Sequence, residues 1–217
     1  MPYPRQHRSQ VRARIVDSAR RLFNRHGFDN VSVDRIMSGA GLTRGGFYSY
    51  FSSKSDLYTE VLGCFFTDPE WRNRWEGVEV DLASKHAAAQ VVRAYLSRQH
   101  YDDVENSCPM VALPGDVTRG SERAKSAFEG VFLAMVGVLA RSVDGHDSRR
   151  RTRAEAIAAL CIGGMVVARA LAHRPVADRL RDACMAAALD LGGWSRHHHA
   201  TPRRSRTASK VNVPRRS

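Results

Sequence analysis

Long apolar runs, clustered cysteines and a hydrophobic N-terminal segment are all missing from this 217-residue chain. No apolar stretch reaches the roughly 18 to 20 residues needed to cross a bilayer, and the first residues, MPYPRQHR, contain no hydrophobic signal core. We therefore expect a cytoplasmic protein without a membrane partner. The cysteines are expected to be reduced, because their positions show neither metal-ligand spacing nor the density of a disulfide framework. They are Cys64, Cys108, Cys161 and Cys184.

Catalytic constellations are lacking as well. The sequence shows no convincing nucleophile with its base, no metal-ligand set and no phosphate cradle. The pairs Gly45-Gly46 and Gly163-Gly164 are too short for a nucleotide-binding fingerprint. No second group of ligands accompanies His197 to His199. We expect no enzyme activity, no cofactor and no metal site.

Positive charge is what the chain has in excess, and it is confined to the two ends. Residues 1–58 carry a net charge of +6, residues 59–193 a net charge of −1, and the last 24 residues a net charge of +7. A basic N-terminal part beside a neutral body suits a nucleic-acid partner for the first and a different role for the second. A charge that serves solubility alone is the other interpretation.

The most informative stretch is GLTRGGFYSYFSSKSDL, residues 41–57. A turn at residues 39–41 leads to Thr43, which can cap a short helix through its side-chain oxygen. Gly45 and Gly46 lie in the first turn of that helix, where each costs about 1 kcal/mol relative to alanine. Without side chains there, the backbone could lie against a large flat partner. The nearby arginine, tyrosine and lysine side chains supply donors for phosphates and base edges.

Helix signals surround this stretch. Ser32 can cap a preceding helix, and Ser53 with Asp56 matches the capping-box spacing of a following one. A helix, a three-residue turn and a short helix form the helix-turn-helix pattern, whose second helix enters the major groove of DNA. Further upstream, a disordered basic arm at residues 1–8 is expected to precede apolar residues that recur at helical spacing from about Ser9 to His26. Gly27 can close this helix in a left-handed conformation. The arginines at the start of that helix suit either partner phosphates or a solvated cationic face.

The segment VDRIMSGAGLTRGGFYSYFSSKSDLY, residues 33–58, resembles the DNA-binding signature of the tetracycline-repressor (TetR) family of bacterial transcriptional regulators. The resemblance is specific over Val11 to Val61 and loose beyond. It implies an all-α homodimer, with a three-helix DNA-binding domain in residues 1–58 and a helical ligand-binding and dimerisation domain in residues 59–193. A basic disordered tail is expected in residues 194–217.

The resemblance also implies which residues contact an operator in double-stranded DNA. Thr43, Arg44 and Gly45 are expected at base edges, whereas Tyr48, Tyr50 and Lys54 are expected at phosphates. Ser32 is expected at a phosphate from the preceding helix. Except for Gly45, these residues carry the hydroxyl and cationic donors that such contacts use.

The body offers weaker signals for a small-molecule effector. Trp71 and Trp75, four residues apart, could line a cavity or belong to an ordinary core. Cys108 precedes Pro109 at the expected start of a helix, where the dipole favours a partly exposed, reactive thiolate; a structural cysteine is the alternative. We expect an effector site formed by Trp71, Trp75, Cys108, Met110 and Phe128. Pro114 should break the helix that begins at Pro109.

Two late helices with small-residue faces, near residues 157–171 and 175–191, suit a dimer interface as well as core packing. The expected function is that of a dimeric, sequence-specific regulator, most simply a repressor released from a palindromic operator by an unidentified effector. Two alternatives remain open. One is a repressor that senses oxidants or electrophiles through Cys108, and the other is an architectural DNA binder that uses its basic ends.

Overall fold

The computed structural model describes residues 5–64, 78 and 80–195, and the regular structure within these ranges is entirely helical. The expected all-α fold is confirmed. None of the described helices is both long and apolar enough to span a membrane. The elements are α1 (Arg5–His26), α2 (Val33–Gly39), the 3-10 helix η1 (Arg44–Ser49), α3 (Lys54–Gly63), α4 (Ala87–Tyr95), α5 (Arg98–Asp102), α6 (Pro109–Ala112), α7 (Pro114–Arg119), α8 (Glu122–Ala140), α9 (Asp147–Ala170) and α10 (Arg174–Leu191).

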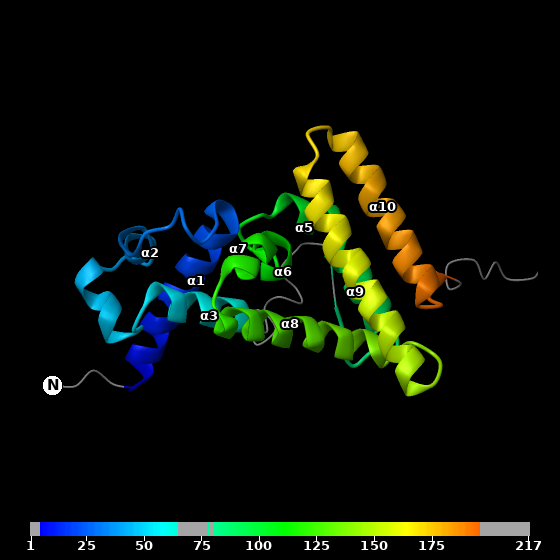
Figure 1. Ribbon diagram of the computed structural model, residues 1–217, viewed down its shortest axis with the longest axis horizontal. Helices are drawn as coiled ribbons and strands as arrows, with labels where there is room; N and C mark the ends of the chain where they lie inside the picture. Colours follow the sequence, from blue (N-terminus) through cyan, green and yellow to red (C-terminus); the bar gives the residue numbers. More distant parts are fainter. Residues whose placement is uncertain (1–4, 65–77, 79, 196–217) are drawn as a thin grey trace, which may run out of the picture.

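The first four elements form an N-terminal head around one apolar core (Figure 1). Each element contributes one apolar face, as their helical spacing predicts. Among the side chains with no exposed surface are Ile15, Phe23, Ile36, Phe47 and Leu57. Since Phe47 is the buried residue of η1, it anchors this short helix to the head and leaves the remaining faces of η1 outward.

The body is built around a second core, to which α4, α6, α8, α9 and α10 contribute. The helices α9 and α10 lie side by side, joined by a short connection at residues 171–173 (Figure 1). Gly164 allows their close approach, because a Cβ at this position would lie 2.8 Å from Sγ of Cys184. The two helices therefore form a tightly packed layer.

The head packs directly against the body. The helix α8 packs against α3, and the head core includes three side chains from beyond α3, namely Leu113, Val117 and Ala124. The proposed division at residue 58 falls inside α3 (Lys54–Gly63). The first residue of the expected tail, Trp194, donates a hydrogen bond from Nε1 to the carbonyl oxygen of Ser142 at 3.0 Å.

Several helix ends follow the expected signals. Gly27 ends α1 with φ at +75°, a left-handed value that favours glycine. Oγ of Ser32 accepts a hydrogen bond from the backbone amide of Arg35 at 3.2 Å, and so caps α2. The helix that starts at Pro109 stops at Ala112, and Pro114 begins α7. The basic arm extends less far than expected, because α1 already begins at Arg5.

Candidate DNA-binding interface

The turn before η1 places this helix at the end of the head. Gly41 adopts φ at +66°, and the amide of Leu42 donates to the carbonyl of Met37 at 2.9 Å. Thr43 occupies the N-cap position of η1 in an extended conformation, but its side chain makes no capping hydrogen bond. The expected cap by Thr43 is therefore wrong. Its exposed side chain lies beside the first turn of η1 instead.

The outward face of η1 combines a bare backbone with large polar side chains. A Cβ added to Gly45 would find no described atom within 4 Å, so packing against the described residues does not require glycine there. Tyr48 is 67% exposed, although tyrosine is usually partly buried. Its ring meets that of the buried Phe47 edge-on, with the ring centroids 5.2 Å apart. An open backbone beside an exposed phenol fits a partner that approaches closely.

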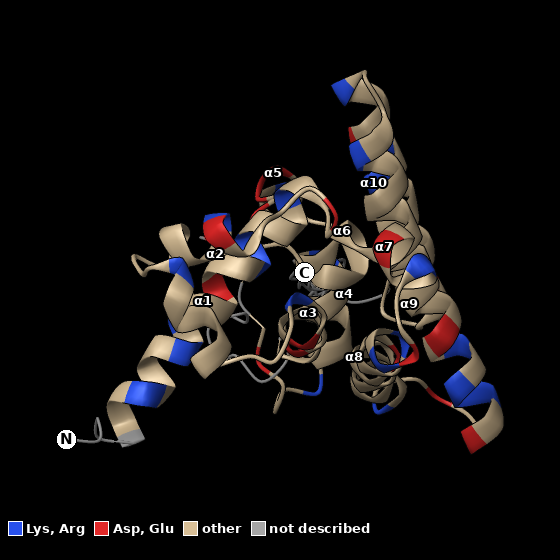
Figure 2. Ribbon diagram, turned by 60° about the vertical axis from the view of Figure 1, so that its left-hand side comes forward, with Lys and Arg blue, Asp and Glu red and all other residues tan. Residues whose placement is uncertain are grey.

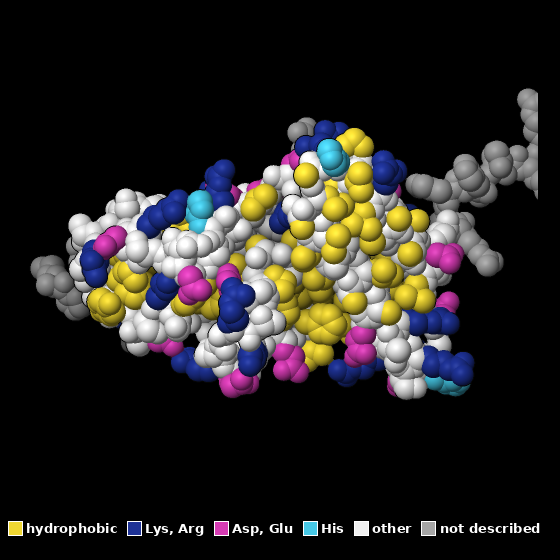
Figure 3. All heavy atoms as spheres, turned by 45° about the horizontal axis from the view of Figure 1, so that its top comes forward, with side chains coloured by type: hydrophobic (Ala, Val, Ile, Leu, Met, Phe, Trp, Pro, Cys, Tyr) yellow, Lys and Arg dark blue, Asp and Glu magenta, His cyan; other side chains and the backbone are white. Residues whose placement is uncertain are grey.

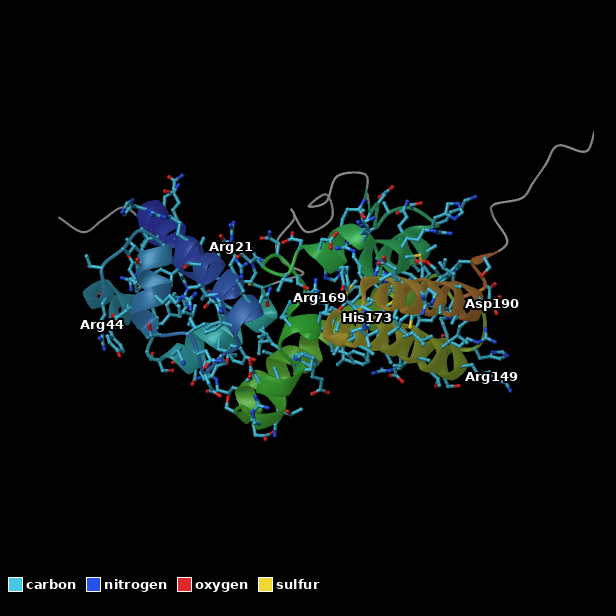
Figure 4. All side chains as sticks on the ribbon, turned by 90° about the horizontal axis from the view of Figure 1, so that it is seen from above. Arg21, Arg44, Arg149, Arg169, His173 and Asp190 are labelled. Carbon is cyan, nitrogen blue, oxygen red and sulfur yellow. The ribbon has the colours of Figure 1, made fainter. Side chains whose placement is uncertain are left out.

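Arg44 belongs to the same exposed face. Its Nη1 lies 3.0 Å from Oδ2 of Asp34 in the first turn of α2, and both side chains are more than half exposed. Exposed ion pairs of this kind contribute about 1 kcal/mol at most, so Arg44 can exchange Asp34 for another acceptor at small cost. Figure 4 shows Arg44 at the end of the molecule remote from Arg149 and Asp190.

Lys54 and Tyr50 lie closer to the interior than the sequence suggested. Nζ of Lys54 donates to the carbonyls of Phe28 and Val31 at 3.0 and 3.1 Å, and it lies 4.1 Å from the centroid of the Phe28 ring. Tyr50 is half-buried at the C-cap of η1. Sequence reasoning missed the role of Lys54 in the head, because its carbonyl partners lie 26 and 23 residues away in the chain.

The start of α1 is rich in arginine, and Figure 2 shows that basic positions recur along this helix. Three of these arginines bond to the helix-turn-helix. Arg8 and Arg12 donate to the carbonyls of Ser49 and Tyr50, and Arg14 donates to that of Ala40. These contacts give the unusual charge at this helix start an intramolecular explanation. Helical spacing alone could not reveal it, since the acceptors lie 26 to 41 residues away.

This head matches a known family. Residues 15–61 match the family model of the bacterial regulatory proteins of the tetR family. The head belongs to the TetR family. The matched residues cover the second half of α1 and all of α2 and η1, and they end within α3.

Relatives with curated names agree with the family. AcrR of Shigella flexneri, an HTH-type transcriptional regulator, is 40% identical over 57 residues, which are 26% of either chain. The HTH-type transcriptional repressor AcnR of Corynebacterium glutamicum is 26% identical over 164 residues, which cover 66% of this chain and 83% of AcnR. The match with AcrR thus spans about a quarter of that relative, whereas the match with AcnR extends into the body.

Solved structures show the same fold. E. coli NemR in its reduced form is 17% identical and superimposes with a TM-score of 0.64 over 84% of this chain and 97% of NemR. A TetR-family regulator from Agrobacterium tumefaciens is 21% identical, with a TM-score of 0.58 over 83% of this chain and 98% of its own. Both likenesses extend the TetR fold to the body helices.

Of the residues expected at an effector site, three are described, and all three lie in or against the body core. Cys108 and Met110 have no exposed surface, and Phe128 packs partly buried against both cores. Cys108 is the N-cap of α6, as expected, and its burial among core side chains favours the structural alternative over a partly exposed thiolate. Trp71 and Trp75 lie outside the described residues.

Larger open cavities lie elsewhere. Residues of α1, of α2 and of the turn after it line a cleft of about 1000 Å³, and a groove of about 470 Å³ runs along α9 and α10. Neither is lined by Cys108, Met110 or Phe128. These three side chains therefore contribute to packing in this conformation.

Proposed function

We propose that this protein is a homodimeric repressor, which binds a near-palindromic operator in double-stranded DNA and leaves it when a small-molecule effector binds. The observation that carries the proposal is the outward face of η1, where Arg44 and Tyr48 flank the open backbone at Gly45. In a helix-turn-helix this element enters the major groove. Arginine there can pair with O6 and N7 of guanine, the commonest specific contact to a base.

The contacts divide by chemistry. Thr43, Arg44 and Gly45 stand at the start of η1, and we assign them to base edges. Tyr48, Tyr50 and Lys54 supply hydroxyl and ammonium donors, and we assign them to phosphates. Ser32 is exposed at the N-terminus of α2, where backbone amides also favour a phosphate.

Dimerisation is supported by the outer face of α9 and α10. Apolar side chains gather on this face (Figure 3), and its groove is lined by small and aliphatic residues that include Gly163, Leu180 and Val167. Val167, Val176 and Leu191 of these helices are exposed, and a larger exposed apolar patch often marks a protein interaction site. A two-fold axis through this face would pair the same helices of two copies and present two heads to half-sites about 34 to 36 Å apart or more.

Effector release needs a path from body to head, and the contact of α8 with α3 supplies one. Arg123 on α8 pairs with Asp56 on α3 at 2.7 Å, so a shift of α8 acts directly on the helix that follows η1. An effector could then favour a head separation unsuited to the operator. Its effect is limited by the difference between its affinities for the two states.

The first experiment is the selection of bound duplexes from a random DNA pool at a salt concentration of about 0.15 M, where non-specific phosphate contacts are weakened. We expect a palindromic consensus with two spaced half-sites. Arg44→Ala should then relax the preference at one position in each half-site. Absence of any enriched sequence would contradict the proposal and favour an architectural role. An equal loss of affinity on all duplexes would exclude base reading by Arg44.

A further inference from the structure

The carboxyl end of η1 is a natural place for a cation. The last carbonyl groups of a helix lack partners within the helix, and the helix dipole favours positive charge beside them. At this end, Nη2 of Arg8 lies 2.7 Å from the carbonyl oxygen of Ser49, and Nη1 of Arg12 donates to that of Tyr50. Two arginines of α1 thus satisfy the end of the element that we assign to DNA reading.

Arg12 is fixed more firmly than Arg8. Its Nε donates to Oε1 of Glu60 at 3.1 Å, and its Nη2 pairs with Oε2 of the same carboxylate. This two-point contact matches the planar fork of a guanidinium and defines its orientation. The guanidinium carbon also lies 4.1 Å from the centroid of the ring of Phe51, a residue that is 4% exposed.

Glu60 lies on α3, so one guanidinium joins three elements of the head. Arg12 lies on α1, is oriented by Glu60 of α3, and donates to the carbonyl of Tyr50, the residue that ends η1. A lysine could not replace it, because a single ammonium on a flexible stem lacks the fork that reaches the carboxylate and the carbonyl together. Arg12 therefore contributes more through the geometry of its guanidinium than through its positive charge.

We propose that Arg12 is a positioning residue for operator recognition: oriented by Glu60, it fixes the angle of η1 in the groove and does not itself neutralise a DNA phosphate. The inference rests on the proposed function and names a determinant within it. It separates Arg12 from the phosphate-binding set, although the positive charge near the start of α1 suggests phosphate contact.

The test measures affinity for the selected operator over a range of salt concentrations for the full chain and its variants. Arg12→Lys keeps the charge and loses the fork. We expect its affinity to fall roughly tenfold, as for a lost charge-assisted hydrogen bond, while the salt slope stays that of the wild type. If Arg12 neutralised a phosphate, Arg12→Lys would bind almost normally, and Arg12→Met would lower the slope by about one unit. Either result would overturn the inference.

Glu60→Gln gives an independent and opposite expectation. Removing a negative charge near DNA should strengthen binding if only electrostatic attraction matters. The positioning role predicts weaker binding, because Arg12 loses its orienting carboxylate. In a double-mutant cycle, the loss of binding free energy in the Arg12→Lys, Glu60→Gln double variant should be less than the sum of the two single losses. Stronger binding by Glu60→Gln, or fully additive losses, would contradict the proposal.

Arg21→Lys is the matched control, because Arg21 lies on the same helix and pairs with Asp17 one turn away. Its affinity should stay within about twofold of the wild type, as expected for an exposed pair. Far-ultraviolet circular dichroism and thermal unfolding confirm that each variant is folded, and Arg12→Lys and Glu60→Gln decide the matter if Arg12→Met does not fold. A wild-type chain that selects no operator overturns the proposed function and the inference together, whereas normal binding by Arg12→Lys overturns the inference alone.

Discussion

Nη1 of Arg123 lies 2.7 Å from Oδ1 of Asp56, and this pair joins α8 to the first turn of α3. Only half of the expected capping box is present: Oγ of Ser53 accepts from the amide of Asp56 at 3.0 Å, while the carboxylate of Asp56 reaches α8. We expect a coupling energy of about 0.2 to 1 kcal/mol, because Arg123 is largely exposed and solvent screens the pair. A double-mutant cycle of Asp56→Asn and Arg123→Gln in urea unfolding measures it.

The coupling should decrease when the salt concentration is raised, because ions screen exposed charges. A salt-independent coupling would show that packing rather than charge joins these two helices. Arg93→Gln is a suitable control, because it removes an exposed guanidinium from α4, which is neither of the two paired helices. Combined with Asp56→Asn, it should show no coupling energy.

Lys54→Met should affect both the stability of the head and its affinity for DNA. Two carbonyl groups lose their ammonium partner, which should lower the free energy of unfolding by about 1 to 3 kcal/mol. An ammonium has three donors, and the third is our proposed phosphate contact. The salt slope of binding should therefore fall by about one unit on every duplex. A normal slope in a destabilised variant would confine Lys54 to the internal role.

Adjacent glycines on α9 should respond differently to substitution. Gly164→Ala places a methyl group against Cys184 within the chain, so we expect a loss of about 1 to 3 kcal/mol in the free energy of unfolding. Gly163 lines the groove and has no described atom within 4 Å of an added Cβ. Gly163→Arg should therefore leave the fold intact and abolish the dimer, as sedimentation velocity would show.

Gly130→Arg on α8 is the control for the dimer, because this position is equally open in the chain and lies outside the α9–α10 face. It should sediment like the wild type. A dimer that tolerates Gly163→Arg would place the interface elsewhere.

Asp178 should make stability depend on acid pH. The side-chain hydrogen bond from Arg181 lowers the pKa of Asp178, and Arg181 itself is 4% exposed. Because the pKa is lower in the folded state than in the unfolded state, the stabilisation is complete above the ordinary value of about 3.9. It is lost as the pH falls through the folded-state value. The melting temperature of Asp178→Asn should lie below that of the wild type at pH 7, and the difference should vanish in strong acid.

Thiol accessibility tests the alternative function. Cys108 and Cys161 have no exposed surface, and burial raises the pKa of the Cys161 thiol. We expect both to react with an aromatic disulfide reagent only as fast as the protein unfolds, which mass spectrometry of the labelled peptides would show. Rapid modification of Cys108 in the native protein, with operator release that disappears in Cys108→Ser, would instead support a thiol sensor.

Sequence reasoning succeeded where the signal was local. The helix ends that it predicted depend only on neighbouring residues, so local propensity is sufficient to find them. They are the caps at Ser32 and Ser53, the left-handed Gly27 and the break before Pro114. The resemblance to the TetR family predicted the all-α fold, and the apolar spacing indicated where several of its helices lie.

Long-range partners were beyond such reasoning. Arg12 meets Glu60 across 48 residues and Tyr50 across 38, and an arginine in a sequence gives no sign of whether it will bind a carbonyl or a phosphate. Cys108 shows the same limit, because its cap position was predictable but its burial depends on helices from elsewhere in the chain. Hydrogen-bond partners of long side chains therefore required the coordinates.

The core shared across the junction also limits how such regulators can be recombined. Leu113, Val117 and Ala124 complete the apolar interior of the head although they lie outside the segment that carries the family signature. A chimaera that transplants residues 15–61 onto another body would meet foreign side chains at these three positions. Operator specificity should therefore transfer between relatives with full stability only when this patch is exchanged together with the reading head.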